Sequence, residues 1–376
     1  TTAHTLSLHD ALPIFNFKNN HFNYAPTYTG PGHASIYTGT IPMNHGIVGN
    51  HWFDKFNNVL VYCAQDDSVQ PLGTNSNAGK MSPHRMKSTT VADQNRLHTQ
   101  MRGKTIGVGL KDRGAILPAG HTANAAYWFN GEDEGKWISS SFYMKDLPKW
   151  VQDFNNSDIA ESYLKTWNTL YDIDTYIASG EDNTVFERGF NGKDNSTFPY
   201  DLKVLAADNN NYNFIINTAY GNDLTTDFAL AAIENEGLGI DEHTDFLTIS
   251  YSSTDYVGHN FGVNSKEVED TYLRLDANLA KILQKLDKVA GKGNYTVFLT
   301  SDHGAVDVPA YLQSKNIPAG YFDSANLNSE LEEYILNKLK FLLKKSMLSP
   351  LCPPTSKITF LSLFNNFLSA FKIFFL

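Results

Sequence analysis

The chain has 376 residues, which is enough for one large α/β domain or two ordinary domains with a sizeable core. Its 30 basic and 40 acidic residues give a formal net charge of −10. This balance argues against nucleic acid as a stable partner, because proteins that coat phosphates need a basic surface. The 19 Tyr and 24 Phe indicate a globular chain. Two distant cysteines, Cys63 and Cys352, predict neither a disulfide framework nor a thiolate metal site.

The first 14 residues do not have the pattern of a signal peptide. They lack a basic start and an unbroken apolar stretch, and they contain His4, His9 and Asp10. We interpret residues 1–14 as a leader foreign to the sequence that follows; an ordinary disordered leader is the alternative.

Residues 15–345 alternate short β-rich runs with longer helical patterns. This alternation predicts an α/β fold, with a mostly parallel sheet sandwiched by helices. A helix is predicted over residues 32–38, and buried strands over residues 104–110, 245–251 and 294–300.

An amphipathic helix is predicted over residues 265–289, between the last two strands. Strand, helix and strand would form a right-handed crossover unit, with both strands ending at the same sheet edge. Ligands of open α/β sheets bind beyond that edge. Residues 126–200 are rich in Trp, Tyr, Asn, Asp and Gly, and we expect them to be a loop-heavy insertion that forms a lid or rim.

The C-terminal end has an abnormal composition. No acidic residue follows Glu333, and residues 346–376 are mainly Leu, Phe, Ser and Pro without periodicity. We interpret this part as a frameshifted tail. A membrane anchor over residues 358–376 is the alternative, but two asparagines and Lys372 lie inside a span barely long enough to cross a bilayer.

Two pairs of polar residues follow two of the predicted strands. Asp255 and His259 come after the strand at 245–251, and Asp302 and His303 after the strand at 294–300. Carboxylate oxygen and imidazole nitrogen suit zinc, so the two pairs predict a metal site above the sheet. A loop-capping aspartate beside a surface histidine is the alternative for either pair taken alone.

Thr29 stands immediately before a Gly-Pro-Gly turn that opens a helix. Backbone N–H groups and the helix dipole favour an anion there, so a phosphoryl group could be held over the threonine oxygen. A threonine alcohol is a poor nucleophile at neutral pH, and coordination to zinc is one way to activate it. A helix N-cap threonine is the alternative.

Five motifs in order, APTYTGPGHASIYTG, HGIVGNHWFD, LKDRGAILPAGH, STDYVGH and TSDHGA, resemble the alkaline phosphatase superfamily. The most similar branch is the phosphate-irrepressible alkaline phosphatases, relatives of nucleotide pyrophosphatase/phosphodiesterases. The resemblance implies an α/β core, two zinc ions, a phosphothreonine intermediate and a small phosphate-ester substrate. It also implies a periplasmic or secreted protein, although the chain contains no signal peptide.

The resemblance assigns the metal ligands. Thr29 matches the nucleophile and is also a ligand of one zinc, which Asp302 and His303 share. Asp255 and His259 match two ligands of the other zinc.

The resemblance also assigns three residues to the phosphoryl group. Asn50 matches the asparagine that hydrogen-bonds a nonbridging phosphoryl oxygen. Lys111 and Arg113 match the pair that distinguishes the monoesterases from the diesterases, since two cations can clamp a monoester dianion.

Two ligands of the family pattern are missing. The family supplies an aspartate well upstream of the nucleophile, where only Asp10 is acidic, and a histidine far downstream of the DH pair, whereas His303 is the last histidine. We therefore interpret the chain as an incomplete copy, truncated at both ends, and expect weak or no activity from it.

Other functions remain open at this stage. A phosphodiesterase or nucleotide pyrophosphatase is the main alternative, although Lys111 and Arg113 argue against it. A metal-free binding or scaffold protein is a second. A sulfatase is disfavoured because position 29 is not Cys or Ser. No membrane association is expected, and the sequence gives neither the physiological substrate nor the oligomeric state.

Overall fold

A computed structural model describes residues 17, 20–132 and 134–347 of the chain. The predicted leader, and the predicted tail beyond Met347, lie outside the described residues. The chain divides into two units, which are residues 1–50 with 62–308, and residues 51–61 with 309–376.

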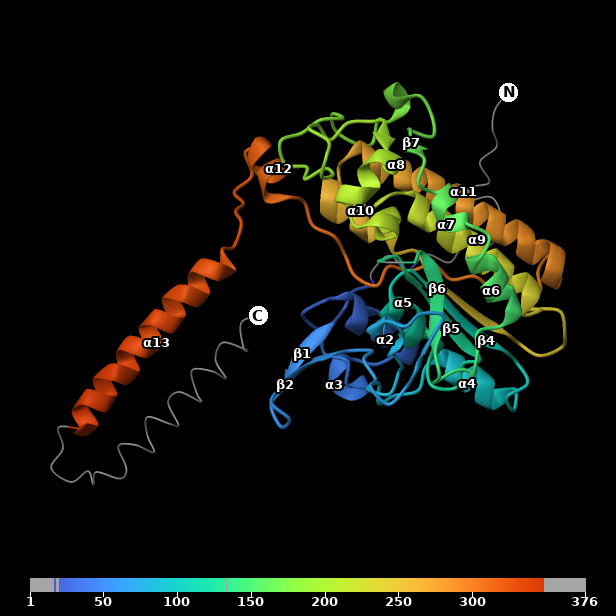
Figure 1. Cartoon of the computed structure of the whole chain (residues 1–376), viewed down its shortest axis with the longest axis horizontal. Helices are drawn as coiled ribbons and strands as arrows, with labels where there is room; N and C mark the ends of the chain where they lie inside the picture. The colour runs from blue at the N-terminus through green and yellow to red at the C-terminus, as the bar shows by residue number, and fades with distance from the viewer. Residues whose placement is uncertain (1–16, 18–19, 133, 348–376) are drawn as a thin grey trace. The chain divides into compact units, whose positions relative to one another are not determined.

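A five-stranded sheet forms the centre of the first unit (Figure 1). Strand β4 pairs in parallel with both of its neighbours, β5 and β9, whereas the β5–β6 and β6–β3 pairs are antiparallel. The α/β class is confirmed, and the sheet is mixed. In spatial order the strands are β3 (Pro71–Leu72), β6 (Lys136–Ser140), β5 (Ala125–Asn130), β4 (Thr105–Gly109) and β9 (Phe246–Ser250).

The two strands predicted over residues 104–110 and 245–251 are confirmed as β4 and β9. Every residue of β4 is buried, as expected for a central strand covered on both faces. Gly107 lets a helix pack close to this strand, because a Cβ there would lie 2.3 Å from the carbonyl oxygen of Ala115.

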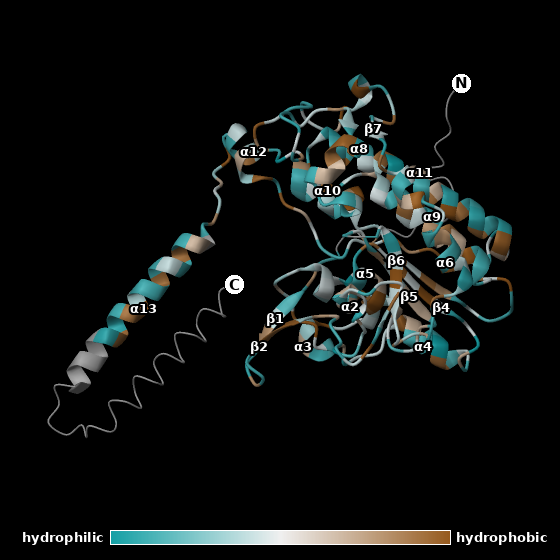
Figure 2. Ribbon diagram, viewed as in Figure 1, coloured by the Kyte–Doolittle hydropathy of each residue, from teal (hydrophilic) through white to brown (hydrophobic). Residues whose placement is uncertain are grey.

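Helices cover the sheet on both faces (Figure 1). Helices α2 (Thr29–Thr38) and α5 (Asp112–Ala119) pack on one face, and α9 (Tyr220–Asn235) and α11 (Lys266–Leu286) on the other. Apolar residues gather on the sheet strands between these layers (Figure 2).

Aromatic contacts join the sheet to its covering helix α9. Trp137 of β6 stacks on Phe228 of α9, with ring centroids 4.1 Å apart. Both side chains are buried. Stacked rings of this size supply a large share of the apolar area that holds the layers together.

The helix predicted over residues 265–289 is confirmed as α11. Ser265 caps its N-terminus by accepting a hydrogen bond from the Val268 N–H at 3.2 Å. A π-helical turn, Asp287–Gly291, follows its end. The helix predicted over residues 32–38 is α2, which begins earlier, at Thr29, and ends at Gly39 in a left-handed conformation.

The strand predicted over residues 294–300 is wrong. This segment has no strand structure, and the side chains of Val297, Phe298 and Leu299 are 37%, 59% and 64% exposed. The Phe298 ring lies 6.0 Å from that of Phe246 in β9, yet among the described residues no strand pairs with that side of β9. An apolar, β-branched run becomes a strand only where a neighbour accepts its backbone hydrogen bonds. The predicted crossover unit is therefore not formed.

The insertion predicted over residues 126–200 is wrong at its beginning. Strands β5 and β6 occupy residues 125–140, and their side chains belong to the core. From residue 141 to 199 the chain forms only short elements between loops. These are α6 (Lys149–Asn155), α7 (Ile159–Ser162), β7 (Thr166–Trp167) and a 3₁₀ turn (Ile173–Thr175).

The remaining elements of the first unit are short. They are α3 (Pro42–His45), α4 (Val91–His98), α8 (Leu202–Leu205), α10 (Ser253–Phe261), β8 (Tyr200–Asp201) and 3₁₀ turns at Asn77–Gly79, Ala206–Asp208 and Asn211–Asn217.

The second unit contains the hairpin residues of β1 (His51–Asp54) and most of β2 (Val59–Tyr62), with helices α12 (Pro309–Ser314) and α13 (Ser324–Met347). No helix in the described part of the chain combines the length and apolarity that crossing a membrane requires.

Candidate active site

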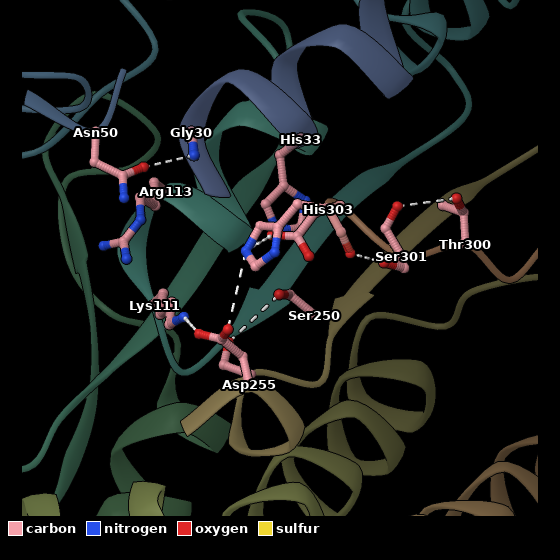
Figure 3. A network of polar contacts seen from close by, with 12 residues as sticks. Gly30, His33, Asn50, Lys111, Arg113, Ser250, Asp255, Thr300, Ser301 and His303 are labelled. Carbon is pink, nitrogen blue, oxygen red and sulfur yellow. Dashed lines mark hydrogen bonds and ion pairs between the residues drawn. The ribbon is translucent and has the colours of Figure 1, made fainter. Parts of the chain in front are cut away.

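Two parallel strands bring the predicted residues to one sheet edge. Strands β4 and β9 end in register, with Gly109 opposite Ser250. Lys111 follows the first strand and Asp255 lies in the helix after the second. Their side chains meet, with Lys111 Nζ 2.6 Å from Asp255 Oδ2 (Figure 3). The site therefore lies where open α/β sheets bind ligands.

The four residues of the two predicted metal pairs lie together. His259 Nε2 is 3.3 Å from Asp255 Oδ1, and His303 Nε2 is 3.9 Å from the same oxygen. His303 Nε2 is also 3.6 Å from Asp302 Oδ2. The two pairs converge, as predicted, although the second pair does not follow a strand.

The Asp255 carboxylate is stabilised in its charged form. Burial alone would raise its pKa, but the hydrogen bond with His259 and the ion pair with Lys111 hold the pKa well below its usual range. The hydrogen bond to Asp255 raises the pKa of His259, against burial and the charges of Lys111 and Arg188. Burial lowers the pKa of Lys111, against the attraction of Asp255.

His33 belongs to this cluster and was missed by the sequence reasoning. Its Nε2 lies 3.6 Å from Asp302 Oδ2, and its side chain is 12% exposed. Burial lowers its pKa to about 4, so the imidazole is neutral at pH 7. The signal in the sequence is its position four residues after Thr29, which places both on one face of α2.

Helix α2 approaches the second metal pair closely. A Cβ at Gly32 would lie 2.1 Å from the carbonyl oxygen of Asp302, so only glycine fits there. This contact brings the first turn of the helix against the Asp302 backbone.

Thr29 is the first residue of α2 and is 5% exposed. Tyr28, not Thr29, is the N-cap residue, so the N-cap interpretation of Thr29 is wrong. The next residue, Gly30, donates its N–H to Asn50 Oδ1 at 2.7 Å (Figure 3). The structure thus places the predicted nucleophile and Asn50 beside each other at the helix N-terminus.

The Arg113 guanidinium is held by a pair that the sequence reasoning missed. Arg113 Nη1 donates to the Tyr62 hydroxyl at 3.0 Å, and that hydroxyl donates to Asp112 Oδ1 at 2.5 Å. Burial, with the charge of Asp112, raises the pKa of Tyr62 well above its usual range, so the phenol keeps its proton. No sequence pattern connects Tyr62 with residues so distant along the chain.

The donor types of the cluster fit zinc, because they are carboxylate oxygens and imidazole nitrogens. Their positions form an incomplete set: within residues 20–132 and 134–347, no group of three or more His, Cys, Asp and Glu side chains is arranged to hold one metal ion. The Asp255 carboxylate instead contacts Lys111.

The site and fold agree with comparisons with known proteins. Residues 14–345 match the type I phosphodiesterase / nucleotide pyrophosphatase family, and the chain belongs to this family. It is 49% identical over 327 residues to alkaline phosphatase PhoV of Synechococcus elongatus, which covers 87% of this chain and 58% of that protein. It is 50% identical over 311 residues to alkaline phosphatase PafA of Elizabethkingia meningoseptica, covering 82% and 56%. The resemblance to the alkaline phosphatase superfamily is confirmed.

Solved structures show the same fold. A crystal structure of wild-type alkaline phosphatase PafA superposes with a TM-score of 0.80 at 49% identity, and covers 84% of this chain and 61% of that one. A second PafA structure, with a TM-score of 0.79, carries replacements of a threonine, an asparagine, a lysine and an arginine, in that order. The chain spans about three fifths of the length of these relatives.

Proposed function

We propose that the protein is a zinc-dependent phosphomonoester hydrolase with Thr29 as its nucleophile. The observation that carries this proposal is the convergence of Lys111, Asp255 and His303 at the sheet edge. The similarity to two alkaline phosphatases at about 50% identity supports it. The four residue types replaced in the second PafA structure also occur here, in the same order and with almost the same spacing, at Thr29, Asn50, Lys111 and Arg113.

The reaction is a double in-line displacement. The Thr29 oxygen attacks phosphorus while the bond to the departing alcohol breaks, which leaves a phosphothreonine. Water then attacks the same phosphorus and the threonine oxygen departs, which releases inorganic phosphate. The N–H groups and dipole at the start of α2 favour the phosphoryl anion throughout.

Three side chains would contact the phosphoryl group. Asn50 donates a hydrogen bond to a nonbridging oxygen, and Arg113, which Tyr62 holds in place, donates a charged one. Lys111 is the third, and its present partner is Asp255. Two cations favour a monoester dianion over a diester, which has one charge fewer.

Zinc would be held by Thr29, Asp302 and His303 at one position and by Asp255 and His259 at the other. When bound, it supplies positive charge that makes the threonine alcohol nucleophilic. Two further ligands of the family pattern, an aspartate and a histidine, have no match among these 376 residues.

The test compares the protein with Thr29→Ala and Thr29→Ser variants, using phenyl phosphate hydrolysis and zinc content. We expect Thr29→Ala to lose hydrolysis by at least about a thousandfold, since no nucleophile remains. The serine variant keeps a hydroxyl and should retain measurable turnover. Unchanged hydrolysis in Thr29→Ala would overturn the proposed nucleophile.

Two further functions are separated by simple measurements. A phosphodiesterase would hydrolyse a bis(aryl) phosphate faster than the matching aryl monoester. A non-catalytic scaffold protein would bind no zinc and hydrolyse neither. We also propose a periplasmic or secreted location, from the similarity to the alkaline phosphatases, which cell fractionation would check.

A further inference from the structure

A polar cleft lies on the first unit beside His259. Its volume is about 410 Å³, within the range of about 300–1,000 Å³ that small-molecule sites occupy. Half of its lining residues are asparagines, which is unusual for a small-molecule site, where apolar side chains normally prevail. The lining residues used below are Arg188, Phe190, Asp208, Asn210, Phe214, Asn217 and Asn260.

The cleft adjoins the candidate active site. Asn260 follows His259 directly in α10, and its carbonyl oxygen accepts a hydrogen bond from the Arg188 N–H at 2.8 Å. The charge of Arg188 also acts on the His259 imidazole. Helix α10 therefore contributes both the Asp255 and His259 pair and one residue of the cleft lining, Asn260.

The alcohol released by the reaction would leave on the side of the site that holds Asp255 and His259. Gly30 and Asn50 lie at one end of the site and Asp255 at the other (Figure 3). Thr29 attacks from the Gly30 end, and an in-line displacement expels the alcohol on the opposite side of phosphorus. The departing group therefore points toward Asp255, and the cleft adjoins the partner of Asp255, His259, through Asn260.

The amide groups of the cleft suit hydroxyl groups. The side-chain Nδ2 of Asn260 donates to Asn217 Oδ1 at 3.2 Å. Within the described residues no hydrogen-bond partner occupies the side-chain Oδ1 of Asn260 or the side-chain Nδ2 of Asn217. An acceptor and a donor held side by side complement neighbouring hydroxyls, which both donate and accept. The lining contains one cationic side chain, Arg188, and one anionic side chain, Asp208, so its formal charges sum to zero and the cleft suits a neutral group.

The aromatic residues of the cleft do not favour a nucleobase. Phe190 and Phe214 are buried and pack edge to face, with ring centroids 4.6 Å apart. Base stacking requires an open aromatic face. A hydroxyl-rich alcohol fits the lining better than a flat, stacking one.

We propose that this cleft binds the alcohol portion of the substrate and selects phosphate esters of sugars and other polyols. The proposal rests on the hydrolase function proposed above. It names the substrate class for that site, which the sequence did not give.

The test uses Asn217→Leu and Asn260→Leu, in which a side chain of similar size loses its amide. The full chain is assayed with glucose 6-phosphate and with phenyl phosphate. We expect the ratio of kcat/KM for the sugar ester to that for phenyl phosphate to fall about five- to tenfold in each variant. Asn235→Leu, on α9 and outside the cleft lining, is the matched control and should leave the ratio unchanged. Asn210→Ala, at an exposed position, is a second cleft variant if either leucine variant fails to fold.

Binding is measured separately from turnover. Saturation-transfer NMR on the sugar protons of glucose 6-phosphate should show contact with the parent chain and a weaker signal in the two cleft variants. An unchanged ratio and unchanged NMR signal in both would overturn the cleft proposal alone. Absence of both zinc binding and phenyl phosphate hydrolysis in the parent chain would instead count against the hydrolase function, while the NMR signal still tests the cleft.

Discussion

The two segments that supply the proposed metal residues are built differently. Asp255 follows β9, a strand paired to the buried centre of the sheet, and its carboxylate is fixed by Lys111 at 2.6 Å. Asp302 follows residues 294–300, which are mostly exposed and pair with no strand in the described part of the chain, and its contacts with His33 and His303 are longer, at 3.6 Å each. A side chain that lies just beyond the end of a strand is held more firmly when that strand is paired within the sheet.

The comparison has a direct test in hydrogen exchange, where we expect the largest difference. Amides of β4 and β9 are buried in paired strands and should exchange only through rare opening of the sheet. Amides of residues 295–301 have no strand partner and should exchange about a thousandfold faster or more. Mass spectrometry of peptides after deuterium labelling measures both. Equal protection of the two segments would contradict the comparison.

A third region shows burial outside the five-stranded sheet, and the pH dependence of its stability sharpens the comparison. Tyr200 donates to Glu267 Oε1 at 2.5 Å, which attaches the loop-rich segment to α11. Glu267 is fully buried, and burial raises its pKa to about 8; burial also raises the pKa of Glu187 to about 7, and that of Asp182.

The sign of the effect follows from these raised values. Between a pH of about 4.5 and 8 the folded chain keeps the Glu267 proton that the unfolded chain loses, so stability falls as pH rises and levels off above 8. Glu267→Gln should remove most of this loss, which is on the order of a few kcal/mol. Urea unfolding at pH 5, 7 and 9 measures it. A parallel pH dependence in the parent and the variant would refute the assignment.

Removal of the two aspartates compares the segments by stability. Asp255→Ala leaves Lys111, which is 8% exposed, without its partner and should cost about 2 kcal/mol. Asp302→Ala should change the free energy of unfolding by less than about 0.5 kcal/mol. Urea unfolding at pH 7 gives both values. The double variant Lys111→Met with Asp255→Leu should recover much of the loss, because no charge remains buried.

A small effect on stability, with a larger one on activity, is expected at Gly32. A Cβ there displaces the Asp302 backbone, but because that segment is unpaired, Gly32→Ala should change stability by less than about 1 kcal/mol. Phenyl phosphate hydrolysis should fall at least about tenfold, since Asp302 and His303 move. Gly258→Ala is the matched control, because its added Cβ meets no atom within 4 Å. Equal activities of the two variants would show that the close approach has no functional role.

The sequence predicted those parts of the fold where local pattern and tertiary environment agree. The all-buried β4, the strand β9 and the amphipathic α11 have the composition and period of their elements. Residues 294–300 have the same kind of composition but lack a neighbour in the described chain. Strands β5 and β6 were hidden because the Gly, Glu and Asp residues between them are typical of a loop.

The candidate site was predictable to a similar degree. Motif resemblance located the residues at the strand ends and at the start of α2, and the structure brings them together. His33 and Tyr62 were missed, because their roles depend on contacts with Asp302 and Asp112, far away in the sequence. Such contacts follow from the packing of α2 and α5, which no local pattern specifies.

The hydrogen bond from Gly30 to Asn50 has one further consequence. The two ends of a carboxamide have almost the same shape, so sterics alone do not decide which way the group faces. Here the helix N–H takes the oxygen end, at 2.7 Å, so the amino end is the one that can donate to another group. An aspartate at position 50 would accept the same bond but would offer the phosphoryl group only another negative oxygen. The first turn of α2 thus sets the polarity of a neighbouring side chain as well as the conformation of its own backbone.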